Sequence, residues 1–337
     1  MSSSIPLWKR IVALLVFLVL LAALIGVCTR ALTPYVNKTG VTWRRYEAEP
    51  RNSIQMLFFG SSYVFCDICP AELYARTGYT SYVVGGPTLS APMIWCYLRQ
   101  ALQTQQPDVV FVDLGCVDYA HTTNYPEINI GMMPWGFNRV AATLDCAPQE
   151  LRKGLLFPLY SYHDAWNQLS AEEVRMRLTD RSVDMAAGYC YYSTPQRLDF
   201  IPDGQPDLTS PAYRSNLEYL RKIADLCRRK KIPLVFTNMP GALSQQGLSE
   251  QLRQDVQFYE EIQIWDFAVC DMGLISEVDF FDAAHMNYSG AVKLATYFAE
   301  HLDELHLTFG SKDFDHALWD ARVDYIRSPE RAAESAS

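Results

Sequence analysis

The chain has 337 residues, of which 49% are hydrophobic and 20% are charged, so it is long enough and apolar enough to bury a large core. This composition argues against a disordered protein. The formal net charge of -9 argues against a polyanion as the main partner, and we expect no nucleic-acid partner.

An apolar segment stands near the start of the chain. Residues 11–28 form an apolar run without any charge, preceded by Lys9 and Arg10. About 18 helical residues cover most of a ~30 Å hydrocarbon core, so we predict a transmembrane anchor over residues 11–29 that contacts the lipid bilayer. The flanking cations predict a cytoplasmic N-terminus over residues 1–10 and an extracytoplasmic main domain at the cell membrane. A cleaved signal peptide is the alternative.

Beyond the anchor, residues 30–52 are polar and predict a stalk. Short runs rich in Val, Ile and Phe then alternate with helical patterns. This alternation predicts an α/β fold, a three-layer α/β/α arrangement around a flavodoxin-like parallel sheet. The predicted strands are 53–60, 81–86, 107–115, 232–238 and 263–268, and the predicted helices are 68–77, 89–104, 212–230, 248–262 and 289–305, the last with Ser289 as N-cap.

The main α/β domain is predicted to span residues 53–310. Within it, residues 116–210 break the alternation and are rich in Tyr, Pro and Trp, which predicts an inserted cap. Residues 311–337 are predicted to be a charged C-terminal tail, which is frayed at its end, "ERAAESAS". The chain has nine cysteines, and we interpret most of them as small buried side chains, because the spacing of Cys66 and Cys69 has no matching second pair.

Two short motifs at opposite ends of this domain could form one site. Gly60, Ser61 and Ser62 follow the first predicted strand, and Asp282 and His285 stand three residues apart before the last predicted helix. Serine is a poor nucleophile without a base, and an imidazole oriented by a carboxylate is such a base. We therefore predict a catalytic site of Ser62, His285 and Asp282. A plain strand-to-helix turn capped by Ser62 is the alternative interpretation.

These motifs resemble those of the SGNH/GDSL hydrolase superfamily, which has G-x-S after the first strand and D-x-x-H before the last helix. The anchor, "FFGSSYVF" and "DAAHMNYSGAVKLA" resemble more particularly the membrane-anchored branch that includes the D-alanyl-lipoteichoic acid biosynthesis protein and the alginate O-acetylation proteins. The resemblance implies that Ser62 is the nucleophile, His285 the general base and Asp282 the group that orients it. Ser61 then stands where the soluble esterases carry aspartate.

The resemblance also implies an oxyanion hole. Its donors would be the amide of Ser62 and that of Gly85 or Gly86. The family's third block maps onto Gly115 to Asp118, where Val117 replaces the oxyanion-stabilising asparagine, and Asn124 from the cap is a substitute donor. A missing donor typically costs ~100-fold to 1,000-fold in rate.

Two classes of function follow. The first is a serine esterase or acyltransferase that moves acetyl, D-alanyl or similar groups of a cell-envelope polysaccharide or teichoic acid. The second is a catalytically weak accessory module that assists a multi-pass membrane acyltransferase. His163 and Trp166 in the cap are candidate substrate contacts, with aromatic packing as the alternative. We expect neither a cofactor nor a metal.

Overall fold

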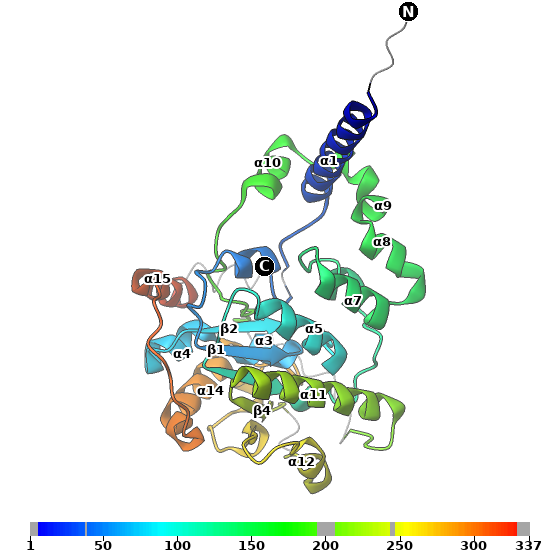
Figure 1. Cartoon of the computed structure of the whole chain (residues 1–337). Coiled ribbons are helices and arrows are strands. Elements are labelled where there is room, and N and C mark those ends of the chain that lie inside the picture. Colours follow the sequence, from blue (N-terminus) through cyan, green and yellow to red (C-terminus); the bar gives the residue numbers. More distant parts are fainter. Residues whose placement is uncertain (1–5, 38, 194–205, 243–246, 329–337) are drawn as a thin grey trace, which may run out of the picture.

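The computed structural model describes residues 6–37, 39–193, 206–242 and 247–328. Five parallel strands form one sheet in the order β2-β1-β3-β4-β5 (Figure 1). This topology confirms the predicted parallel α/β fold. Each strand is shorter than its apolar run, because part of each run lies in the adjoining loops. The strands are β1 (Met56–Gly60), β2 (Ser81–Gly85), β3 (Val109–Asp113), β4 (Leu234–Asn238) and β5 (Gln263–Asp266).

Successive side chains of a strand point to opposite faces of the sheet, and here both faces are apolar. Helices therefore cover both faces and form two apolar cores with the sheet. On β1, Leu57 and Phe59 belong to one core, whereas Met56 and Phe58 belong to the other. The first core is shared with α2 (Trp43–Glu47), α5 (Ala91–Ala101), α11 (Pro211–Lys230) and α12 (Glu250–Val256), and the second with α3 (Ser62–Asp67), α4 (Pro70–Thr77) and α14 (Tyr288–His301).

Helix α1 (Leu7–Leu32) projects away from the sheet (Figure 1). It is long and apolar enough to cross a membrane, and it contains the whole predicted anchor. Its side chains are exposed from Leu7 to Val27 and half-buried from Cys28 onward. The α/β domain therefore begins to cover the helix near Cys28.

The predicted stalk is wrong for its second half. Val41, Trp43 and Tyr46 are buried in the first core, and the Val41 amide donates to the carbonyl of Gly85 at 2.9 Å. Apolar side chains scattered in a polar segment carried no periodicity that would have marked them as core.

The predicted C-terminal tail is packed onto the domain as far as residue 328, and its predicted frayed end lies outside the described residues. Residues His316–Arg327 form helix α15, which packs on α4 through buried Trp319 and Ile326. Its Arg322 is fully buried and pairs with buried Glu49. Residues 329–337 lie outside the described residues.

Between β3 and α11, the described part of the predicted cap contains short helices and no strand. They are η1 (Leu114–Cys116), α6 (Pro126–Asn129), α7 (Phe137–Cys146), η2 (Gln149–Leu151), α8 (Arg152–Leu156), α9 (Pro158–Tyr162), η3 (His163–Asn167) and α10 (Ala171–Thr179). Residues 194–205 of the predicted cap lie outside the described residues. The remaining elements are η4 (Phe267–Val269), α13 (Ser276–Asp279) and η5 (Leu302–Leu305).

Candidate active site

The turn after β1 places Ser62 at the carboxyl edge of the sheet. Gly60 ends the strand, Ser61 is the N-cap of α3, and Ser62 is the first helical residue. A Cβ on Gly60 would lie 2.3 Å from Val64 Cγ2 and 2.9 Å from Asp113 Cβ, so this position must be glycine for α3 to turn so tightly against the sheet. Ser61 is fully buried, and its Oγ accepts a long 3.4 Å hydrogen bond from the Tyr119 hydroxyl.

The loop that carries Asp282 and His285 is closed on itself. Phe280 and Met286 form an isolated antiparallel bridge, and the Phe281 amide donates to the His285 carbonyl at 2.8 Å. The loop then leads directly into α14, whose N-cap is Asn287.

The predicted N-cap of α14 at Ser289 is therefore wrong. The Asn287 side chain accepts from the amides of Ser289 and Gly290, whereas the Ser289 hydroxyl donates to Asp279. Asparagine and serine are both favoured N-cap residues. The helical pattern did not show which of Asn287 and Ser289 precedes the helix, so the prediction placed its start two residues too late.

The structure brings Ser62, His285 and Asp282 into one hydrogen-bonded array. His285 Nε2 lies 2.7 Å from Ser62 Oγ, and His285 Nδ1 lies 2.9 Å and 3.0 Å from the two carboxylate oxygens of Asp282. Asp282 Oδ1 also accepts from the backbone amides of Ala284 and His285 at 2.8 Å and 2.9 Å. These two backbone hydrogen bonds hold the Asp282 carboxylate in place independently of its contact with the His285 ring.

The charge state of Asp282 suits this arrangement. Partial burial by itself raises the pKa of Asp282, but hydrogen bonds from the His285 ring and from the Ala284 amide lower the pKa below its ordinary value overall. An ionised Asp282 favours the His285 tautomer with its proton on Nδ1, an assignment that follows from the hydrogen-bond network. Nε2 is then free to accept the Ser62 hydroxyl proton.

Several residues that sequence reasoning missed hold the array together. Buried Asp67, at the end of α3, accepts the Met286 amide at 2.9 Å, and the Tyr63 ring lies 5.5 Å from the His285 ring. A strap of residues 186–192 also joins the two halves of the site. Within it, the Cys190 amide donates to the Phe65 carbonyl at 2.6 Å, and the Tyr192 carbonyl accepts from the Tyr288 amide at 2.7 Å.

Aromatic stacking reinforces this strap. The Tyr192 ring stacks on Phe281 with centroids 4.0 Å apart, and the Tyr191 ring stacks on Tyr288 at 5.0 Å. The contact between Cys190 and Phe65 of α3 could not be predicted from the sequence, because the two residues are more than a hundred positions apart.

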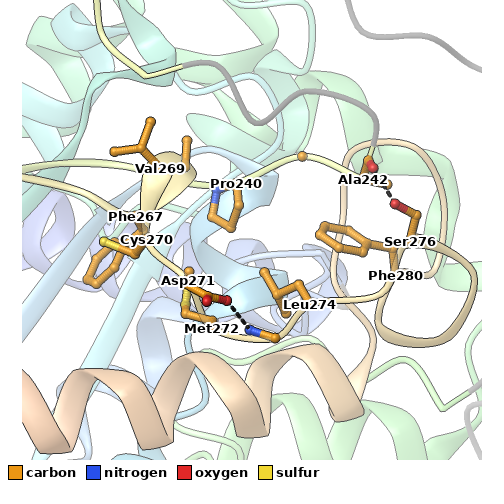
Figure 2. Close-up of a pocket in the computed structure, with 13 residues that line it drawn as sticks. Pro240, Ala242, Phe267, Val269, Cys270, Asp271, Met272, Leu274, Ser276 and Phe280 are labelled. Carbon is orange, nitrogen blue, oxygen red and sulfur yellow. Dashed lines mark hydrogen bonds between the residues drawn. The ribbon is translucent and has the colours of Figure 1, made fainter.

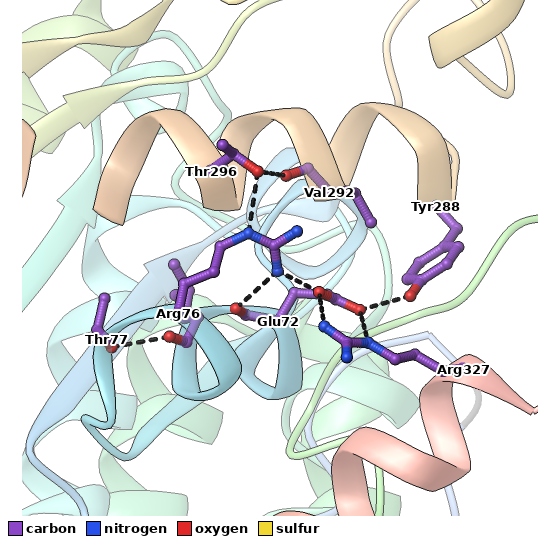
Figure 3. A network of polar contacts seen from close by, with 8 residues as sticks. Glu72, Arg76, Thr77, Tyr288, Val292, Thr296 and Arg327 are labelled. Carbon is purple, nitrogen blue, oxygen red and sulfur yellow. Dashed lines mark hydrogen bonds and ion pairs between the residues drawn. The ribbon is translucent and has the colours of Figure 1, made fainter. Parts of the chain in front are cut away.

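A second polar network anchors the start of α14 (Figure 3). Buried Glu72 on α4 accepts hydrogen bonds from the Tyr288 hydroxyl, Arg76 and Arg327. Burial alone raises the pKa of Glu72, but Arg327, Tyr288 and Arg76 together lower it to about 2. Tyr288 stands three residues after His285, so this network fixes the far end of the loop that carries the imidazole.

Among the described residues, the predicted oxyanion donors are only partly available. The amide of Ser62 lies in the first turn of α3 and has no intrahelical acceptor. Gly85 ends β2 beside Gly60, and the amide of the following residue, Gly86, already donates to the Gly60 carbonyl at 3.3 Å. Val117 is buried.

The asparagine that the fold places beside Gly86 is not the predicted one. Asn124 is exposed, whereas buried Asn129 in α6 lies so close that its Oδ1 would be 2.5 Å from a Cβ on Gly86. Asn129 Nδ2 donates to Pro87 O and Thr123 Oγ1. In the described part of the chain, neither the Gly86 amide nor the Asn129 side-chain amide is therefore a free donor for an oxyanion.

The two predicted substrate contacts lie in η3, which packs beside α1. The Trp166 side chain is 69% exposed, and the exposed His163 ring contacts the Tyr160 carbonyl and Asp164. These two residues therefore lie at the α1 end of the molecule.

A cavity of about 320 Å³ opens beyond the ends of β4 and β5 (Figure 2). Phe280, at the start of the loop that carries His285, lines this cavity. Ala242 lines it too, and its amide donates to the carbonyl of Ala283 in the same loop. Its described lining residues do not include Ser62, Asp282 or His285. Figure 2 shows the Ser276 hydroxyl bonded to the Ala242 carbonyl at one side of this cavity.

All nine cysteines lie in the described part of the chain, and none of them forms a disulfide. Cys66 and Cys69 are fully buried, which raises the pKa of both thiols and disfavours the thiolate that a metal or a redox partner needs. Cys146 also lies near His121 and Asp145. Burial raises the pKa of this thiol too, and both His121 ring nitrogens already contact Ser215 and Asp145.

The chain shows limited similarity to known proteins. A protein-family model matches residues 196–307, about a third of the chain, and this stretch contains Asp282 and His285. No curated protein matches the chain. Among solved structures, the chain is similar to one described as a GDSL-like lipase from Bacteroides ovatus, with 11% identity and a TM-score of 0.27. The similarity covers 77% of this chain and 55% of that one, so the chain spans about half the length of the structure that it matches.

Proposed function

We propose that this chain is a membrane-anchored serine esterase or acyltransferase of the SGNH type. The observation that carries the proposal is the array in which His285 contacts Ser62 through Nε2 and Asp282 through Nδ1. The sequence motifs around these residues support it, and α1 supports anchoring beside the envelope polymers that would be substrates.

The chemistry follows from the array. Ser62 Oγ attacks the acyl carbonyl carbon while His285 Nε2 takes the hydroxyl proton, and the developing imidazolium is stabilised by Asp282. The imidazolium then gives the proton to the departing alkoxide oxygen, which leaves an acyl ester on Ser62. Water, or a sugar hydroxyl that His285 deprotonates in turn, attacks this ester and releases Ser62. The acyl groups would be acetyl, D-alanyl or a similar small group on an extracytoplasmic polysaccharide or teichoic acid.

A covalent probe tests the nucleophile. A fluorophosphonate should label the full chain, and Ser62→Ala or His285→Ala should abolish labelling. Ser61→Ala is the matched control, because its Oγ contacts Tyr119 and not His285. Equal labelling of wild type and Ser62→Ala would remove Ser62 from the mechanism.

Transfer and hydrolysis are separated by adding a wall-derived oligosaccharide with an acyl donor. A bound hydroxyl can compete with water, because positioning in well-aligned systems is worth ~10⁵ M or more in effective concentration. We expect mass spectrometry to find the acyl group on the sugar with wild type and not with His285→Ala. Rapid hydrolysis without acceptor modification would identify a plain esterase.

The second candidate function is an accessory module with little activity of its own. The hydrogen bond from the Gly86 amide to Gly60 and the apolar Val117 favour it, because they leave few free donors for an oxyanion. In that case a folded protein would show neither labelling nor turnover alone, and turnover would appear only with a multi-pass membrane acyltransferase.

A further inference from the structure

The exposed part of α1 matches the thickness of a bilayer. Within it, the uncharged run from Ile11 to Cys28 has 18 residues, which rise about 27 Å along a helix, against a hydrocarbon core of ~30 Å. If α1 spans the membrane, Cys28 lies at the level of the lipid headgroups. Whatever covers α1 from Cys28 onward lies at that level too.

The elements that cover α1 are α9, η3 and α10, and Figure 1 shows α9 and α10 on either side of its lower end. They carry large exposed side chains beside the helix. Tyr160 is 58% and Trp166 is 69% exposed, and Phe157, which precedes α9, is 65% exposed. Tyrosine and tryptophan are the side chains enriched at membrane interfaces, because one end of each ring system is apolar and the other is polar.

An arginine cluster surrounds the same end of α1, made of Arg30, Arg44, Arg45 and Arg177. Arg30 Nε donates to the Arg177 carbonyl at 3.3 Å, Arg44 donates to the same carbonyl, and Arg177 donates to the Leu32 carbonyl at 2.6 Å. These bonds fix α10 to the end of α1.

The cluster has more positive than negative charge. Asp180 is the acidic partner within it, 3.7 Å from Arg45 and 2.7 Å from the Tyr35 hydroxyl. Arg30 Nη2 and Arg45 Nε are buried donors that lack an acceptor. Burial lowers the pKa of Arg44, and the neighbouring Arg30 lowers it further. Guanidinium groups with spare donors suit phosphate oxygens, which they bind in bidentate fashion.

We propose that this face of α9, η3 and α10 docks on the bilayer in which α1 sits. The three aromatic side chains would lie in the interface, and the arginine cluster would bind phosphates of anionic lipid headgroups. The inference rests on the anchor of the proposed function, not on its chemistry. It gives Trp166 a lipid-contacting role in place of substrate binding, and it holds the α/β domain at a fixed orientation to the membrane.

Two tryptophans report on the anchor and the docking separately. The full chain is placed in nanodiscs whose lipids carry bromine near the headgroup or near the bilayer centre. Trp8, at the start of α1, reports whether the anchor is inserted, and the Trp166 signal is the difference between Trp8→Phe and Trp8→Phe/Trp166→Phe. The matched control is Trp135, which is 55% exposed but precedes α7.

We expect Trp166 to be quenched at least twofold more by the headgroup-proximal bromine than by the central one, and Trp135 by neither. Phosphatidylglycerol in place of phosphatidylcholine should increase the quenching. Arg45→Gln and Arg30→Gln should remove this increase, whereas Arg228→Gln, the same charge change on the exposed end of α11, should keep it.

Three results would overturn the proposal or its parts. Unquenched Trp166 with quenched Trp8 would overturn docking while leaving the anchor intact. Quenching of Trp166 that is equal in both lipids would remove the phosphate site. Unquenched Trp8 in a chain that separates from the discs would overturn the anchor itself. The quenching of Trp8 and Trp166 does not depend on fluorophosphonate labelling of Ser62. Failure of the proposed chemistry is therefore distinguishable from failure of membrane docking.

Discussion

The carboxylate of Asp67 accepts the backbone amide of Met286 at 2.9 Å, which ties the end of the helix that begins with Ser62 to the residue that follows His285. Asp67 is fully buried, and burial raises its pKa well above the ordinary value. The side chain therefore holds the two halves of the candidate site together from within the core.

This bond predicts a contrast between two substitutions. Asp67→Asn keeps an acceptor of the same shape and should leave fluorophosphonate labelling within about threefold of wild type. Asp67→Leu leaves the Met286 amide unpaired, and a displacement of about 1 Å between Ser62 and His285 is enough to slow labelling ~100-fold. Circular dichroism checks that both variants are folded. Equal labelling of Asp67→Leu and wild type would contradict a positioning role.

The carboxylate of Asp282 is predicted to act through the His285 tautomer. Asp282→Asn keeps the shape but favours the proton on the wrong ring nitrogen, which in a serine-histidine-aspartate site costs ~10⁴-fold in turnover. We expect a loss of about that size in turnover of an activated ester, with KM changed much less. A loss below tenfold would show that His285 does not depend on this carboxylate.

The strap can be tested at Tyr192, whose ring stacks on Phe281 next to Asp282. Tyr192→Phe keeps the stack and should retain activity, whereas Tyr192→Ala removes it and should lower turnover by about tenfold, since such aromatic pairs are worth about 0.5–1.5 kcal/mol beyond burial. Turnover of an activated ester by the three proteins is the measurement. Indistinguishable rates would show that the strap does not position the loop.

Asp113, at the end of β3, predicts how stability depends on pH between about pH 4 and neutrality. Burial raises the pKa of Asp113 to about 7, although the amides of Gly115 and Met239 lower it in part. Because the folded state holds this proton more tightly than the unfolded state, the stabilisation is complete below about pH 4 and is lost as pH rises through about 7.

We therefore expect wild type to lose about 2–3 kcal/mol between pH 5 and pH 8. Asp113→Asn, which cannot titrate, should give a flatter profile, although its amide leaves one backbone donor without an acceptor. Thermal unfolding of both proteins across this range is the measurement. Parallel profiles would rule out Asp113 as the titrating group.

Glu72 predicts the opposite behaviour in acid. Its folded pKa of about 2 lies below the ordinary value, so its stabilisation is present above about pH 4.5 and is lost as pH falls toward 2. Glu72→Gln should destabilise the protein by about 2–3 kcal/mol at pH 7, less than a fully buried pair because Arg327 is partly exposed. Chemical denaturation at pH 7 and pH 3 should show this difference shrinking in acid. If the two proteins differed in unfolding free energy by the same amount at both pH values, the ionised Glu72 carboxylate would not be the source of the stabilisation.

The sequence by itself determined the elements whose cause is local. The apolar run of α1, the buried strands and the helical patterns follow from side-chain periodicity, which is readable without knowing the partners. The G-S-S turn and the D-x-x-H loop were also local, and parallel strands place the ends of such segments at one edge of a sheet. This is why Ser62, Asp282 and His285 could be named in advance.

Tertiary structure decided what depends on contacts between distant segments. Val41 and Trp319 belong to the core only because the sheet and α4 offer apolar surfaces to them, which is a property of packing and not of local pattern. The same holds for Asp67 beneath Met286. The Gly86 amide, expected to face an oxyanion, instead satisfies the Gly60 carbonyl. A backbone donor buried beside a free acceptor bonds to it, and sequence does not reveal which acceptor the fold brings within reach.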